Sequence, residues 1–248
     1  MPGMLHWIVA FTLLGSVGAI LGAALLLLFP QGVRKVLLPF LVSYAVGTLL
    51  GGAFLGLVPA GLSEVPAEPF MATMLGGYVA FFVLEKLVLK RHSLAHEGGP
   101  QKKAAGPLIL IGDAFHNFVD GTVIAAAFMT SPALGVTSAL AVVAHEIPQE
   151  VGEFAILLDS GYSRSKAFLL NMLSATAALP GAILAYFWLA RAAGIMPYML
   201  AVSAASFVYV ASVDLIPSLH QDMKPGATVR QIVLLLAGIA TIAGIHMA

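Results

Sequence analysis

Two polar clusters, each set in an otherwise apolar stretch, contain the side chains best suited to chemistry. The first has the helical spacing i, i+3, i+4, i+7, which places on one helix face Asp113, His116, Asn117 and Asp120. The second contains one imidazole, one amide and three carboxylates, namely His145, Glu146, Gln149, Glu150 and Glu153. Imidazole together with carboxylate favours zinc, iron, nickel or copper, whereas oxygen ligands alone favour magnesium or calcium. The clusters therefore indicate a site for a divalent transition metal.

The charge of these clusters also requires a compensating cation. No lysine or arginine occurs between Gly106 and Tyr162, although the two clusters hold five carboxylates, and a sixth acid, Asp214, lies in a later apolar stretch. Carboxylates repel one another in a dry environment, so protons, water or a bound cation must balance them. Mutual hydrogen bonding that only joins two helices would explain one such pair, but not the whole set.

The composition is that of an integral membrane protein. Hydrophobic residues make up 60% of the chain and charged residues 10%, well below the roughly 25% of a soluble domain. The chain has no cysteine, which excludes disulfides and thiolate ligands. No basic stripe with interleaved aromatic residues is present, so we expect no nucleic-acid partner. The expected partners are the lipid bilayer and metal ions.

Eight segments are long and apolar enough to cross a bilayer as helices of about 20 residues. They cover approximately residues 5–29, 36–58, 70–89, 108–129, 134–158, 167–190, 197–216 and 229–247. We therefore predict an all-α integral membrane protein whose residues 1–248 form a single transmembrane domain. The two polar clusters fall in the fourth and fifth helices.

The distribution of basic residues predicts the orientation in the membrane, because cytoplasmic loops retain lysine and arginine. Ten of the twelve lie in or beside the loops after helices 1, 3, 5 and 7, namely Arg34, Lys35, Lys90, Arg91, Lys102, Lys103, Arg164, Lys166, Lys224 and Arg230. The opposite loops contain only Arg191. Both termini are thus expected outside the cytoplasm. The compact loops favour a prokaryotic plasma (inner) membrane.

The longest expected connection is a mobile cytoplasmic loop over about residues 90–106, which contains His92 and His96. Two solvated histidines in such a loop could bind a metal transiently. We expect them to be less important than the histidines of the helical clusters.

Pro148 lies inside the expected fifth helix and leaves the carbonyl of Ala144 without its usual donor. Within a membrane such a carbonyl is tolerated where it faces protein or a water-filled cavity. We therefore expect a cavity beside His145 and Gln149. Gly121 and Gly152 are expected to let the fourth and fifth helices approach closely.

The clusters resemble the signatures of a known family. Residues 116–121 (His-Asn-Phe-Val-Asp-Gly) and 145–154 (His-Glu-Ile-Pro-Gln-Glu-Val-Gly-Glu-Phe) are similar to the helix 4 and helix 5 motifs of the ZIP family of zinc and iron transporters. The similarity is to the branch whose fifth helix reads His-Glu-x-Pro-His-Glu. Further similar stretches are residues 84–86, 171–174 and 209–217.

This resemblance implies an eight-helix fold in which helices 1–3 and 6–8 form inverted repeats around helices 4 and 5. It implies a transporter, not an enzyme, that carries divalent metal into the cytoplasm by alternating access and forms a homodimer. Zinc is the first expected cargo, with Fe²⁺, Mn²⁺ and Cd²⁺ as the other candidates, and no catalytic cofactor is expected.

The resemblance also implies the ligands of two neighbouring metal positions. One position would be formed by His116, Asp120, His145 and Gln149. The other would share Asp120 and add Asn117 and Glu146. Two further acids, Glu150 and Asp113, would support these ligands or exchange protons. Gln149 replaces the histidine usual in this branch with a neutral amide, which predicts a weaker site or an altered selectivity.

Two other functions remain open at this stage. Residues 145–149 are one residue short of the H-E-x-x-H motif of zinc proteases, in which two imidazoles hold zinc while the glutamate activates water. Gln149 removes the second imidazole of that motif. Chains of carboxylates and histidines also serve as proton relays, so a proton-linked membrane sensor is the second alternative.

Overall fold

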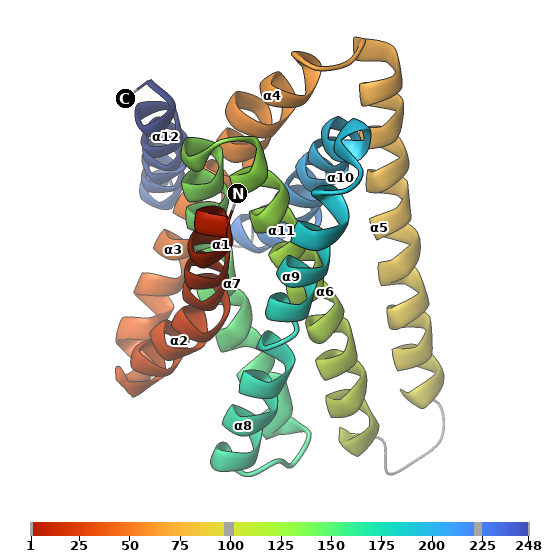
Figure 1. Cartoon of the computed structure of the whole chain (residues 1–248). Coiled ribbons are helices and arrows are strands. Elements are labelled where there is room, and N and C mark those ends of the chain that lie inside the picture. The colour runs from red at the N-terminus through yellow and green to blue at the C-terminus, as the bar shows by residue number, and fades with distance from the viewer. Residues whose placement is uncertain (1, 97–101, 221–224, 248) are drawn as a thin grey trace.

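The computed structural model describes residues 2–96, 102–220 and 225–247, and every regular element in these ranges is helical (Figure 1). The predicted all-α class is therefore confirmed. The first half of the bundle consists of α1 (Pro2–Leu13), the π-helical turn η1 (Leu14–Gly18), α2 (Ala19–Leu28), α3 (Gln31–Gly51), the π-helical turn η2 (Gly52–Leu57), α4 (Val58–Leu62), α5 (Ala67–His96) and α6 (Lys102–Thr130).

The second half consists of α7 (Pro132–Asp159), α8 (Arg164–Ala175), α9 (Ala178–Leu189), the 3₁₀ turn η3 (Ala193–Ile195), α10 (Met196–Tyr209), the π-helical turn η4 (Val210–Leu215), α11 (Ile216–Leu219) and α12 (Pro225–Met247). Joined end to end across their π turns and short breaks, the described helices form the eight rods that the hydropathy pattern predicted. In chain order these rods 1 to 8 are α1–α2, α3–α4, α5, α6, α7, α8–α9, α10–α11 and α12. Both chain ends lie at one end of the bundle, opposite the end where α5 finishes and α6 begins (Figure 1).

The connection expected over residues 90–106 is largely helical. Helix α5 continues to His96 and α6 begins at Lys102, so only residues 97–101 separate the two helices. Those five residues and the side chains of His92 and His96 lie outside the part of the chain that the structure describes. A metal-binding role of these two histidines stays a prediction.

Six of the eight described rods are long and apolar enough to cross a membrane, and α6 and α7 are not among them. These two helices carry the polar clusters, and they pack against each other within the bundle. Helix α6 also contacts α8 and α9, while α7 contacts α2 and α3. The remaining helices thus surround the polar pair, which lets ionisable side chains avoid lipid.

The packing pattern agrees with the expected inverted repeats. Rod 2 packs along rod 8 through α3 and α12, and rod 7 packs along rod 3 through α10 and α5. Rod 4 packs along rod 6 through α6 and α9, and rod 5 packs along rod 1 through α7 and α2. If rods 1, 2 and 3 are exchanged with rods 6, 7 and 8, respectively, and rod 4 is exchanged with rod 5, the same four pairs result. This is the symmetry expected of two inverted repeats.

Rods 2 and 7 also share a local distortion that supports the same correspondence. A proline inside a helix lacks a donor and collides with the carbonyl four residues before it. In both rods a π turn immediately precedes the proline, and the backbone N–H groups of Val58 and Ile216 bond five residues back, to Ala53 and Ala211. The wider turn accommodates Pro59 in rod 2 and Pro217 in rod 7. Single π turns of this kind are frequent near functional sites.

The close helix contacts made by glycine differ from the prediction. A Cβ atom added at Gly121 would lie 1.9 Å from the carbonyl oxygen of Ala178, and one at Gly181 would lie 2.1 Å from that of Phe118. Gly121 therefore brings α6 against α9, not against α7. Gly152 has open space where its Cβ would be. The expectation that Gly121 and Gly152 bring helices 4 and 5 together was wrong, because it ignored which face of each helix the glycine occupies.

Candidate metal centre

Four side chains from α6 and α7 converge on one point. His116 and Asp120 are one turn apart on α6, and His145 and Glu146 are adjacent on α7. One potential ligand atom from each of the four lies within 4.8 Å of the other three. Asp120, His145 and Glu146 are buried, whereas the side chain of His116 is 20% exposed. Three members of the group are thus buried, and His116 is the one that is partly accessible.

The shortest distances within this group match those between ligands of one small ion. His116 Nε2 lies 3.2 Å from His145 Nε2 and 3.3 Å from Glu146 Oε1. His145 Nε2 lies 3.2 Å from Asp120 Oδ2. Ligands about 2.0–2.1 Å from a tetrahedral zinc ion are roughly 3.3–3.4 Å from one another. The shortest contacts of the group are therefore close to the spacing of a tetrahedral set.

His145 is oriented for binding by a bond to its own helix. Its Nδ1 atom lies 2.9 Å from the carbonyl oxygen of Ala141, which can only accept a hydrogen bond. Nδ1 must then carry the proton, and in the neutral ring Nε2 keeps its lone pair. Nε2 is the atom that faces His116 and Asp120. A hydrogen bond of this kind to one ring nitrogen is typical of histidines that bind metal through the other.

The carboxylates of the group have unfilled acceptor capacity. Neither oxygen of Asp120 and neither oxygen of Glu146 accepts a hydrogen bond, although these atoms are buried. An unpaired buried charge is costly, so such carboxylates normally pair with a counter-ion or bind a metal. These oxygens lie close to imidazole nitrogens but form no hydrogen bond with them. This arrangement is expected where oxygen and nitrogen atoms bind the same cation. The donor set of two imidazoles and two carboxylates suits zinc and other first-row divalent metals.

Asn117 and Gln149, two other predicted site residues, each form a hydrogen bond from their side-chain amide to a carboxylate. Asn117 Nδ2 donates to Asp113 Oδ1 at 2.8 Å and to the Asp113 carbonyl at 3.2 Å. Gln149 Nε2 lies 3.4 Å from Glu153 Oε1 and donates to it. Each amide therefore donates a hydrogen bond to a carboxylate one turn away on the same helix. Glu146 lies close to both histidines, 3.3 Å from His116 Nε2 and 3.6 Å from His145 Nε2. A ligand role of Asn117 or Gln149 stays a prediction.

Glu150 forms the third such pair, with a residue of the sixth rod. Asn171 on α8 donates from Nδ2 to Glu150 Oε2 at 2.9 Å, and both side chains are buried. The sequence indicated Asn171 only as a polar residue of a family-like stretch, because its pairing depends on how α8 packs against α7. The carboxyl of Glu150 is thereby held on the α8 side of α7.

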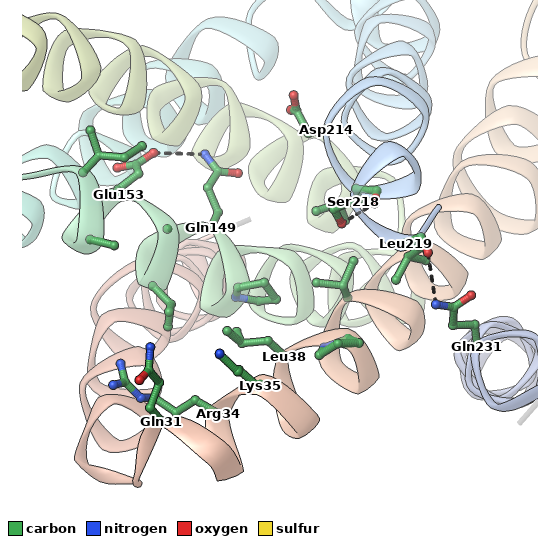
Figure 2. A pocket seen from close by; sticks show the side chains of 18 residues that line it. Gln31, Arg34, Lys35, Leu38, Gln149, Glu153, Asp214, Ser218, Leu219 and Gln231 are labelled. Atoms are coloured by element: carbon green, nitrogen blue, oxygen red, sulfur yellow. Dashed lines mark hydrogen bonds between the residues drawn. The ribbon is translucent and has the colours of Figure 1, made fainter. Parts of the chain in front are cut away.

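A cavity of about 1100 Å³ extends along another face of α7 (Figure 2). Pro148 and Gln149 line it, as expected, whereas His145, beside which the cavity was also expected, is not among its lining residues. Glu153 and Asp214 add carboxylates to its wall, and Arg34 and Lys35 of the first turns of α3 lie across from Gln149 and Glu153 (Figure 2). Its lining residues come from the start of α3, the second half of α7 and the region around α11. The cavity therefore lies toward the end of the bundle that carries most of the basic residues.

The lining also includes residues that the sequence did not indicate for this role. Arg34 and Lys35 served only to assign the cytoplasmic side, and Ser218 was not singled out. Asp214 was noted as an acid in an apolar stretch, but nothing in its spacing relates it to α7. Only the contact between α3, α7 and η4 brings these side chains to one cavity.

Comparison with known proteins places this site in a family. The family described as ZIP Zinc transporter matches residues 97–246, more than half of the chain and a range that includes both polar clusters. The chain belongs to the ZIP zinc transporter family. The resemblance seen in residues 116–121 and 145–154 is thereby confirmed at the level of the family.

Individual relatives agree with this assignment. This ZIP chain is 38% identical over 142 residues to zinc transporter zipt-7.2 of Caenorhabditis elegans, an alignment of 55% of this chain and 30% of the relative. It is 34% identical over 172 residues to zinc transporter ZIP13 of Pongo abelii, covering 67% of this chain and 50% of the relative. With zinc transporter SLC39A7 of Rattus norvegicus the identity is 35% over 153 residues, or 57% and 32% of the two chains. The aligned regions thus span between about a third and a half of these relatives.

Proposed function

We propose that this protein transports divalent transition-metal cations, zinc foremost, across a membrane into the cytoplasm. The observation that carries the proposal is the convergence of His116, Asp120, His145 and Glu146 on one point, with all four carboxylate oxygens lacking hydrogen bonds. Membership of the ZIP family and relatives named as zinc transporters support the same cargo. Fe²⁺, Mn²⁺ and Cd²⁺ are the competing cargoes, because their preferred ligands overlap those of zinc.

The arrangement of cavity and core supports the assignment of a conformational state. The cavity lined by Gln149 and Glu153 lies toward the basic end of the bundle, which the positive-inside rule assigns to the cytoplasm. On the other side of the four-residue group, α6 and α7 continue into a tightly packed apolar core that includes Ile124, Phe128 and Val142. This arrangement corresponds to a state open to the cytoplasm and closed toward the termini.

In this state the residues can hold a cation and pass it on by ligand exchange. The two Nε2 atoms of His116 and His145 and one oxygen each of Asp120 and Glu146 would replace the hydration shell of the ion. Two carboxylates would neutralise its two charges, so the loaded site carries no net charge within the bundle. Gln149, Glu153 and Asp214 on the cavity wall provide the next oxygen atoms along the way to water.

The opposite state requires α6 and α7 to lose this cavity and open the apolar core. The π turns η2 and η4 are suitable places for such a change, because their i to i−5 bonds are less regular than the flanking α-helix. We further propose a homodimer in the plasma or inner membrane with both termini outside the cytoplasm. The position of both chain ends at the end of the bundle opposite most basic residues supports this orientation (Figure 1).

The geometry favours transport over the protease alternative. A zinc protease of the H-E-x-x-H type needs an imidazole at position 149, where this chain has an amide that donates to Glu153. Glu146, which would have to activate water, instead lies among the candidate ligands, 3.3 Å from His116. The proton-linked sensor remains the second candidate, since it would use the same carboxylates without a metal.

Metal uptake into proteoliposomes tests the proposal directly. Uptake of zinc, iron, manganese and cadmium is compared in vesicles that contain the purified protein. The His116→Ala/His145→Ala double variant is the control. We expect saturable flux in the wild type and background flux in the double variant. If folded wild-type protein, oriented correctly, gave no flux above empty vesicles for any metal, the transport proposal would be abandoned in favour of the sensor.

A further inference from the structure

A second cavity, of about 750 Å³, lies between α2, α7 and α8. It adjoins the 1100 Å³ cavity lined by Gln149 and Glu153, which is called the metal cavity below. The two cavities touch different faces of α7, since Glu150 and Leu158 line the second and Gln149 and Glu153 line the first. Its size falls within the roughly 300–1,000 Å³ of ordinary ligand pockets. Nothing in the transport mechanism uses this space.

The walls of the second cavity are mostly apolar and its outer edge faces the bilayer. Ile20 and Leu27 line it from α2, Phe154 from α7, and Phe168 and Leu169 from α8. Leu169 is 66% exposed, and for an apolar residue of a membrane-spanning helix this means exposure to lipid. The cavity is therefore a trough into which a hydrocarbon chain can enter sideways.

The two basic residues of the trough lie at the starts of two helices. Arg164 is the first residue of α8, and Arg34 lies in the first turns of α3. Among the described side chains neither guanidinium forms an ion pair, and the Nε atom of Arg34 is buried without a hydrogen-bond partner. No acidic residue occupies the first turn of either helix. Two arginines at positive helix ends form a strongly anion-attracting end of the trough.

The one described carboxylate in the lining does not oppose these arginines. Glu150 is nine residues before Asp159, the end of α7, which corresponds to about 13 Å along the helix. Its Oε2 accepts a hydrogen bond from Asn171, itself seven residues beyond Arg164 on α8. The paired Glu150 and Asn171 thus belong to the deeper wall, and the arginine end remains without a described counter-ion.

From these observations we infer that the trough binds an anionic phospholipid. Its phosphate lies between Arg34 and Arg164, and one acyl chain follows α2 and α8 into the bilayer past Leu27 and Phe168. Basic pockets between transmembrane helices on the cytoplasmic side are suited to such headgroups. A planar guanidinium also matches the oxygens of a phosphate better than an ammonium does. The inference requires only that the chain spans a membrane, so it does not depend on metal transport.

The lipid would also affect the metal cavity, because Arg34 lines both cavities. Without a counter-ion this arginine repels a divalent cation that leaves past Glu153. A lipid phosphate bound to it on the trough side reduces that repulsion. The bound lipid would therefore ease the passage of cations through the metal cavity, in addition to joining α2, α3 and α8.

The experiment measures lipid retained by the purified full chain, in the absence of metal, by native mass spectrometry. Phosphatidylglycerol is compared with phosphatidylcholine carrying the same acyl chains. The test variants are Arg34→Gln/Arg164→Gln, which removes the charges, and Ala24→Phe, which fills the trough but keeps both arginines. Arg191→Gln is the matched control, because Arg191 is an exposed arginine between α9 and η3, outside the trough. Thermal unfolding of every variant in detergent checks that it is folded.

We expect the wild type and Arg191→Gln to retain phosphatidylglycerol with at least tenfold preference over phosphatidylcholine. In the double variant the affinity for phosphatidylglycerol should fall about fivefold for each arginine removed. Ala24→Phe should bind both lipids more weakly. The inference is overturned if the wild type shows no preference or if the folded double variant keeps it. It is also overturned if soluble glycerol phosphate competes as well as the lipid, because the trough would then make no contribution.

Discussion

The Nε2 atoms of His116 and His145 lie 3.2 Å apart, although 29 residues of the chain separate them and they belong to different helices. Two ring nitrogens at this distance are favourable only if one donates to the other or if both face a shared cation. The hydrogen bond from His145 Nδ1 to Ala141 and the nearby free oxygens of Asp120 favour the shared cation. This pair of histidines is therefore the central feature of the candidate metal centre.

Replacing one of these histidines should remove most of the metal affinity. We expect His145→Ala to weaken zinc binding by at least about a hundredfold. The variant loses one of two imidazoles, and only one imidazole and two carboxylates remain to hold the ion. Isothermal titration of zinc into the detergent-solubilised protein measures this. His6→Ala, at an exposed residue of α1, is the control and should bind zinc like the wild type. Equal losses in both variants would point to a general effect on folding.

Asp120→Asn should separate stability from metal binding. The substitution keeps the shape of the side chain and removes a buried charge whose two oxygens accept no hydrogen bond. Without metal we expect the free energy of unfolding to rise by about 1–3 kcal/mol. With zinc, the stabilisation of about 2.7 kcal/mol expected for the wild type at a hundredfold excess over Kd should largely disappear. Thermal melts with and without zinc test both statements, and a lower stability of the metal-free variant would contradict the first.

Metal affinity should fall as the pH falls. Zinc binds neutral imidazole, so below the ordinary histidine pKa of about 6.5 protons compete with the metal for His116 and His145. With both histidines as ligands, affinity should decrease by up to a hundredfold for each pH unit below that range. Zinc titrations between pH 5 and pH 8 give the slope. In His116→Ala the slope should be about half as steep, and an unchanged slope would argue against His116 as a ligand.

The contact between α6 and α9 should tolerate no added methyl group at Gly121. A Cβ atom there would lie 1.9 Å from the Ala178 carbonyl, which belongs to the backbone and cannot rotate away. We expect Gly121→Ala to destabilise the protein by about 1–3 kcal/mol, as overpacking typically does. Gly152→Ala is the matched control on α7, where nothing lies within 4 Å, and it should be neutral or stabilising by up to about 1 kcal/mol. Melting temperatures of the two variants in the same detergent provide the comparison.

Several properties of this protein can be predicted from local features of the sequence. The number of helices follows from apolar segments long enough to cross a bilayer, and the positions of lysine and arginine predict an orientation. The spacing of His116 and Asp120 places them on one helix face wherever that helix lies. The absence of basic residues near the clusters likewise predicts a cation, because charge balance does not depend on the fold.

Other properties depend on how the helices pack. The sequence places His145, Glu146 and Gln149 close together on α7 but does not say which of them meets α6. In the structure Glu146 Oε1 lies 3.3 Å from His116 Nε2, while the Gln149 amide donates to Glu153. How α6 and α7 meet depends on contacts between segments that are distant in the sequence, and no short stretch encodes it. The two cavities are likewise products of the tertiary structure, because their walls combine helices from both halves of the chain. Helical periodicity therefore determined which side chains share a face, and only the packing decided which of those faces meet.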